Sequence, residues 1–125
     1  MPRLRYALLA LAVAGSLVAA GATQAASHKT KVTKLYGQVG PGFTIMLKRA
    51  NFVPVKTLKP GVYTFVIQDR STEHNFRLKG PGVDKVTPVR YLGTKTWAKL
   101  TLKKGTYNYW CEPHKTQMHG SFKVA

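Results

Sequence analysis

The sequence has little cysteine and little acid. Its 125 residues include a single cysteine, Cys111, which cannot form a disulfide within the chain. Asp and Glu number 4 against 20 Lys and Arg, which gives a net charge of +16. Such a balance favours anionic partners, although a basic surface that only keeps the protein in solution is the alternative.

Two further absences narrow the fold and the function. The basic residues are scattered singly, and no nucleic-acid-binding motif accompanies them, so we expect no dedicated nucleic-acid binding. After residue 26 no segment keeps a helical hydrophobic period beyond about one turn. No internal repeat or second domain follows, so the region 27–125 is expected to form one domain without helices.

The N-terminus has the layout of a secretory signal peptide. Arg3 and Arg5 form a basic start, the apolar stretch 7–20 is Ala-rich and too short for a comfortable membrane span, and small residues follow. We expect residues 1–26 to be a signal peptide cleaved between 22 and 26, with an uncleaved anchor as the alternative. The mature chain would then be periplasmic, extracellular or at the cell surface, monomeric and without a transmembrane span.

The region 27–125 alternates short strand-like segments with turns that contain Gly and Pro. The segment 79–93, with its glycines and prolines, is expected to be the long connection between two sheets. The pattern over 96–102 places Thr96, Ala98, Leu100 and Leu102 on one face and Trp97, Lys99 and Thr101 on the other. Strands are predicted at 35–39, 43–47, 62–68, 75–78, 96–102, 106–111 and 121–124. The spacing predicts an all-β sandwich of about seven to eight strands.

The chain's one thiol lies in a cluster of soft metal ligands. His114 follows Cys111 by three residues, Met118 follows four residues later, and Pro113 restricts the loop between them. An exported lone thiol is buried, paired with another chain or bound to metal. Copper accepts thiolate, imidazole and a weak axial thioether together, and a second imidazole would complete that set.

The second imidazole is predicted to be His74. It lies directly before a predicted strand, whereas His28 lies in a polar lead-in and is expected to be inert. His119 is expected to be exposed beside the site, with replacement of Met118 as the axial ligand as its alternative role. The alternative for Met118 is that it is a core residue and not a ligand, because methionine readily fills gaps in cores.

These residues resemble the cupredoxins, and in particular small exported bacterial proteins of the plastocyanin/azurin type. The resemblance rests on His74-Asn75-Phe76, the aromatic strand that ends in Cys111, Cys-x-x-His, and Met118-x-Gly120. It implies a Greek-key β-sandwich over 27–125 with one copper ion bound by His74, Cys111, His114 and Met118. It also implies that Asn75 ties its loop to the cysteine loop by hydrogen bonds.

The sequence departs from this family beside the ligands. Glu112 follows the cysteine where the family often has Ser or Thr, and Glu73 precedes His74. If both carboxylates lie near the metal, they would favour Cu(II) and lower the reduction potential.

The predicted function is that of an exported type 1 copper protein that carries single electrons, and copper binding or delivery is the alternative. We expect no enzyme, because the ligand set leaves no open position on the metal and Cys111 and His114 lie poorly placed as nucleophile and base. The mature charge, +14 once Arg3 and Arg5 are lost, predicts redox partners with an acidic docking face.

Overall fold

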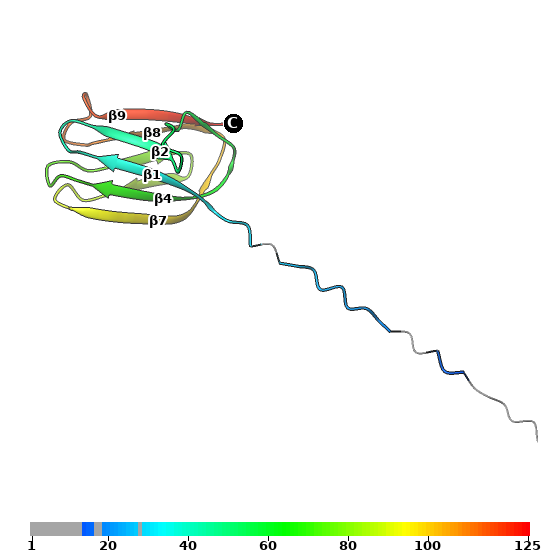
Figure 1. Cartoon of the computed structure of the whole chain (residues 1–125). Coiled ribbons are helices and arrows are strands. Elements are labelled where there is room, and N and C mark those ends of the chain that lie inside the picture. The colour runs from blue at the N-terminus through cyan, green and yellow to red at the C-terminus, as the bar shows by residue number, and fades with distance from the viewer. Residues whose placement is uncertain (1–13, 17–18, 28) are drawn as a thin grey trace, which may run out of the picture.

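The protein folds as two β-sheets packed face to face. A computed structural model describes residues 14–16, 19–27 and 29–125 (Figure 1). The described parts of the chain contain nine strands and no helix, which confirms the all-β sandwich with more strands than the seven to eight expected. The strands are β1 (Thr33–Val39), β2 (Ile45–Arg49), β3 (Thr57–Leu58), β4 (Gly61–Asp69), β5 (Arg77–Gly80), β6 (Val83–Val86), β7 (Gly93–Leu102), β8 (Gly105–Trp110) and β9 (His119–Val124).

The chain crosses between the two sheets several times. One sheet has the strand order β2-β1-β4-β7, and the other has the order β3-β9-β8-β5-β6. β1 is antiparallel to β2 but parallel to β4, because the chain leaves the first sheet for β3 before it returns. These crossovers make a Greek-key sandwich. β4 is a central strand between β1 and β7, a position that suits its β-branched and aromatic residues.

The predicted signal peptide falls partly outside the described residues. Residues 1–13 and 17–18 are not described, and neither is His28. Residues 14–16 and 19–27 are exposed and have no secondary structure, and Figure 1 shows residues 19–27 leading away from the sandwich. Within the part of the chain that the structure covers, no helix is long and apolar enough to cross a membrane.

The core lies between the sheets and includes the cysteine. Tyr107 and Tyr109 of β8 both point inward, as the period of two predicts, and Cys111 continues that face. The Tyr107 ring stacks on Phe122 with centroids 5.2 Å apart, and the Tyr109 ring stacks on Phe76 at 5.5 Å. The Tyr107 hydroxyl accepts a hydrogen bond from the backbone N–H of Lys103 at 2.9 Å, which fixes the start of the strand. The aromatic strand therefore delivers Cys111 from a rigid base.

Several of the predicted boundaries were wrong. The second strand begins at Ile45 rather than at residue 43, because the turn continues through Thr44, whose carbonyl accepts from the Gly40 N–H at 2.8 Å. The strand predicted at 75–78 begins at Arg77, the first residue of β5. The segment 79–93 is only partly a connection, because its first half forms the β5–β6 hairpin. The unpredicted strands β3 and β6 are both short edge strands, whose formation depends on a neighbour more than on local pattern.

The alternation predicted for residues 96–102 is also wrong in the middle of β7. Trp97 and Leu100 both pack against the core, although the pattern places them on opposite faces. The pairing of β4 with β7 shifts register here, and Lys99 has a positive φ of 54°. Two residues of β7 thus lie opposite Thr64, whose hydroxyl accepts the Lys99 N–H at 3.3 Å. This β-bulge changes the face that the following residues occupy.

Candidate metal centre

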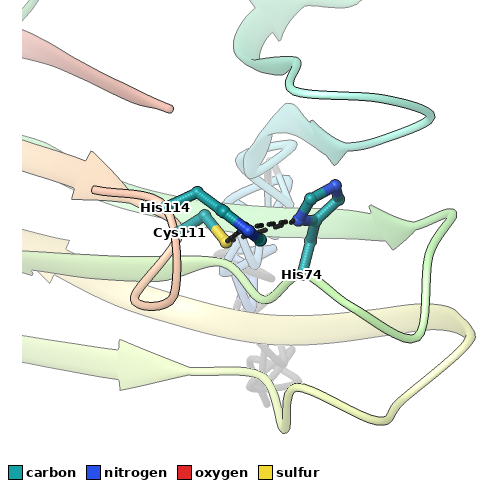
Figure 2. A group of neighbouring side chains, drawn as sticks. All are labelled: His74, Cys111 and His114. Carbon is teal, nitrogen blue, oxygen red and sulfur yellow. Dashed lines mark hydrogen bonds between the residues drawn. The ribbon is translucent and has the colours of Figure 1, made fainter. Parts of the chain in front are cut away.

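Three predicted ligands meet where β4 and β8 end. His74 comes from the loop between β4 and β5, whereas Cys111 and His114 come from the loop between β8 and β9. Figure 2 shows the two imidazoles turned toward the thiol. The Nδ1 atoms of His74 and His114 lie 3.0 Å apart, and each lies 3.7 Å from the Cys111 Sγ.

These distances fit a single metal ion. Imidazole and thiolate ligands lie about 2.0 to 2.3 Å from a transition ion, so two ligand atoms on one ion can be no more than about 4.6 Å apart. All three donor atoms lie within that limit of one another. Cys111 and His74 are buried, and His114 is half-buried. The sulfur lies equally far from the two nitrogens, which suits the trigonal arrangement that copper takes with these donors.

The cysteine loop closes on itself through its own backbone. The His114 N–H donates to the Cys111 carbonyl at 3.2 Å, and the Met118 N–H donates to the His114 carbonyl at 2.8 Å. The Cys111 N–H in turn donates to the Met118 carbonyl at 3.0 Å, which returns the chain to its starting point. The Met118 side chain is fully buried next to this closure. The loop therefore brings the backbone of Met118 back beside Cys111.

The histidine loop is held from outside. Asn75 is buried, and its Oδ1 accepts the Glu112 N–H of the cysteine loop at 2.8 Å. The next residue, Phe76, donates its N–H to the Thr87 Oγ1 at 2.8 Å, and its carbonyl accepts the Thr87 N–H at 3.0 Å. The position of His74 therefore depends on hydrogen bonds to two segments that are distant in the sequence.

Pro113, Glu112 and His119 lie around the donors rather than among them. Pro113 is exposed in the turn between Cys111 and His114. The Glu112 carboxylate points to Arg77, with its Oε1 2.5 Å from the guanidinium. His119 is exposed at the start of β9, and its Nδ1 lies 2.9 Å from the Lys115 carbonyl. His119 is thus exposed, whereas its neighbour Met118 is fully buried.

Phe43 lies against both imidazoles, although the sequence predicted only a place in a strand for it. Its ring centroid lies 4.9 Å from that of His114 and 5.7 Å from that of His74. It follows Gly40 and Gly42, whose positive φ values of 70° and 65° turn the chain back over the site. No local signal marks Phe43, because the residues it touches are far along the chain.

Asp69 is a buried acid at the base of the histidine loop. Its Oδ1 accepts the Ser71 N–H at 3.1 Å, and its Oδ2 has no hydrogen-bond partner among the described residues. Burial raises the pKa of this carboxyl group, whereas the hydrogen bond from Ser71 and the charge of His74 act in the opposite direction. Neutral Asp69 is therefore favoured more than in an exposed aspartate.

Comparison with known proteins agrees with this geometry. Residues 17–125 match the model of a family described as copper binding proteins of the plastocyanin/azurin family. The structure of the copper protein rusticyanin is similar, with a TM-score of 0.56 and 18% sequence identity over 76% of this chain and 78% of that one. A Cu(I) form of an amicyanin variant gives a TM-score of 0.50 and 18% identity over 78% and 87% of the two chains. At these identities the solved structures show a shared fold, and no curated protein sequence matches the chain.

Proposed function

The chain belongs to the plastocyanin/azurin family of copper-binding proteins, the cupredoxins, and from that premise we propose that it carries single electrons as an exported type 1 copper protein. The residues that would hold the copper are His74, Cys111, His114 and Met118. Bound copper supplies a couple between Cu(I) and Cu(II), which exchanges one electron without making or breaking bonds in a substrate.

The observation that carries the proposal is the convergence of three soft donors that the protein already holds together. The cysteine loop is closed by its own hydrogen bonds, and Asn75 joins it to the histidine loop. Donors held in place need little rearrangement when the charge at the site changes, which suits fast electron exchange.

The surroundings of the donors support a carrier over an enzyme. Cys111 is completely buried, His74 is 4% exposed, and Phe43 lies against both imidazole rings. Only the half-buried His114 offers a donor side chain near the surface. A buried thiolate that holds a metal is poorly placed to attack a substrate.

The test is to add Cu(II) to the purified mature protein and to record the visible spectrum. An intense thiolate-to-copper band is expected, and it should be lost in Cys111→Ser. Met118→Leu should keep the band and raise the reduction potential, whereas Met46→Leu, a half-buried methionine on β2, serves as the matched control. A colourless protein at full copper loading would refute the proposal.

Cycles of reduction and reoxidation distinguish the carrier from a protein that delivers copper. A carrier should keep its metal through repeated cycles, as measured by the copper content after each one. If the protein instead releases its copper to a chelator when it is reduced, copper delivery is supported.

The export and the partners belong to the same proposal. Residues 1–26 would be removed as a signal peptide, and the domain 27–125 would meet its partners as a monomer in the periplasm or at the cell surface. Its net charge of +14 favours redox partners with an acidic docking face, so electron exchange should slow as salt rises. A rate indifferent to salt would contradict this part of the proposal.

A further inference from the structure

Arg77 connects three parts of the sandwich beside the cysteine loop. Its Nε and one terminal nitrogen donate to the two carboxylate oxygens of Asp84 on β6, at 3.0 and 2.8 Å. The other terminal nitrogen donates to the Glu112 Oε1 at 2.5 Å. The guanidinium also lies over the Trp110 ring, 5.9 Å from its centroid. Arg77 thus contacts both residues that flank Cys111 in the sequence.

The backbone and its neighbours fix the direction of this side chain. In the β5–β8 ladder Arg77 lies opposite Trp110, and in the β5–β6 ladder it lies opposite Val86. The two hydrogen bonds to Asp84 use the planar fork of the guanidinium, a geometry that orients the group more firmly than a single bond does. The remaining terminal nitrogen is therefore directed toward the cysteine loop by the contact with Asp84, independently of Glu112.

We propose that Arg77 is a positioning residue that holds the cysteine loop through the Glu112 side chain and offsets the Glu112 charge beside the copper ligands. This inference rests on the proposed function for its effect on copper, but the hold on the loop exists without the metal. Asn75 fastens the backbone of Glu112, and Arg77, two residues further on, fastens its carboxylate. The loop is held at one residue by two contacts from the same segment.

The role differs from that of an ordinary surface ion pair. An isolated exposed pair contributes little, since both side chains lose freedom and water screens the charges. Here the Arg77 side chain is only 29% exposed and is already held by Asp84, so less freedom is lost when it meets Glu112. The contact therefore acts on the position of the loop more than a lone pair would.

The charge has a consequence with a definite sign. Glu112 lies next to the cysteine ligand, and an unpaired carboxylate there would favour Cu(II) and lower the reduction potential. Arg77 bridges Glu112 and Asp84, so the three groups together carry one net negative charge and the Glu112 carboxylate is not left unpaired. The lowering of the reduction potential expected from two acidic residues near the metal is thereby reduced for Glu112. It remains for Glu73, which has an exposed side chain.

The first experiment uses the copper-free mature protein. Amide hydrogen exchange over residues 111–118 should become about fivefold faster in Arg77→Gln, an increase of the order expected when one charge-assisted contact is lost. Glu112→Gln should give a similar change, and the double variant should add little to either. Arg49→Gln is the control. Arg49 is the last residue of β2, and it donates to the Thr57 carbonyl rather than to the cysteine loop. Equal exchange in Arg77→Gln and Arg49→Gln would overturn the positioning role.

The second experiment measures the reduction potential of the copper-loaded variants. Arg77→Gln should lower the potential, Glu112→Gln should raise it, and the double variant should return close to the wild-type value. Arg77→Lys should restore the potential but only part of the exchange protection, because lysine keeps the charge without the fork. Shifts of the same sign in both single variants would overturn the charge role. If no type 1 spectrum appears, the proposed function fails, and the exchange experiment still decides the hold of Arg77 on the loop.

Discussion

The two loops that form the metal centre are stabilised in different ways. The cysteine loop, 111–118, carries three of the four proposed ligands and closes through hydrogen bonds between its own residues. The histidine loop carries one ligand, and its neighbours Asn75 and Phe76 bond to segments far along the chain. The first loop is therefore encoded largely by local sequence, and the second takes its position from the assembled sandwich. Changes should affect the two loops unequally.

Removing one imidazole from each loop should have the largest effect. His74→Ala and His114→Ala should each lower copper affinity by more than about 100-fold, since loss of a ligand exceeds the effect of losing a supporting residue. The copper-free proteins should differ, because His74 is buried and His114 is only half-buried. His74→Ala should cost more unfolding free energy, as measured by denaturant titration. Equal losses in the two variants would remove the distinction between the loops.

The second largest effect is expected when the hydrogen bond between the two loops is removed. In Asn75→Ala the Glu112 N–H loses its acceptor, which should cost about 1 to 3 kcal/mol of stability. Copper affinity should fall about 10- to 100-fold, as for other residues that orient ligands. Asn108→Ala, at an exposed position on β8, is the control. Copper competition and denaturant titration of both variants check the prediction, and matching values would show that the tie is dispensable.

Thr87 tests the histidine loop alone. Thr87→Val keeps the shape but leaves the Phe76 N–H without its acceptor, which should cost about 1 to 2 kcal/mol. Amide exchange should rise around Phe76 while residues 111–118 change little. Thr101→Val, exposed on β7, is the matched control. Equal increases in both loops would mean that they open as one unit.

The smallest expected effect is the pH dependence that comes from Asp69. Burial raises its pKa above the ordinary value near 3.8, so the folded state holds this proton more tightly than the unfolded state does. Stability should therefore fall as pH rises from that ordinary value through the raised pKa, and stay lower above it. Asp69→Asn should remove this contribution. Thermal melts of the copper-free wild type and variant check the difference, and parallel curves would contradict it.

Much of the fold was predictable because it follows from local pattern. Alternate residues of a strand share a face, so Tyr107, Tyr109 and Cys111 lie together on the buried side, and turns with Gly and Pro separate the strands. Prediction failed where a neighbouring strand decides the outcome. The bulge at Lys99 reverses the faces in β7, and the edge strands β3 and β6 form by pairing with β9 and β5.

The residues of the metal centre likewise differ in how far local sequence predicts them. Cys111, His114 and Met118 are close in sequence, so their spacing alone indicated a shared site. The structure brings His74 to Cys111 and His114 and leaves His119 exposed at the start of β9. Phe43 and Arg77 had no local signal, because each acts through residues that are near only in the folded chain.

The sequence by itself determined the kind of donors, their spacing around Cys111 and the strand that delivers the thiol. Spacing within a short loop limits the distances its side chains can span, whatever the rest of the fold does. The tertiary structure decided which distant groups lie against the loop: His74 beside His114, Phe43 against the imidazole rings and Arg77 beside Glu112. Those contacts join separate sheets and loops, so they exist only once the crossovers have brought the strands together.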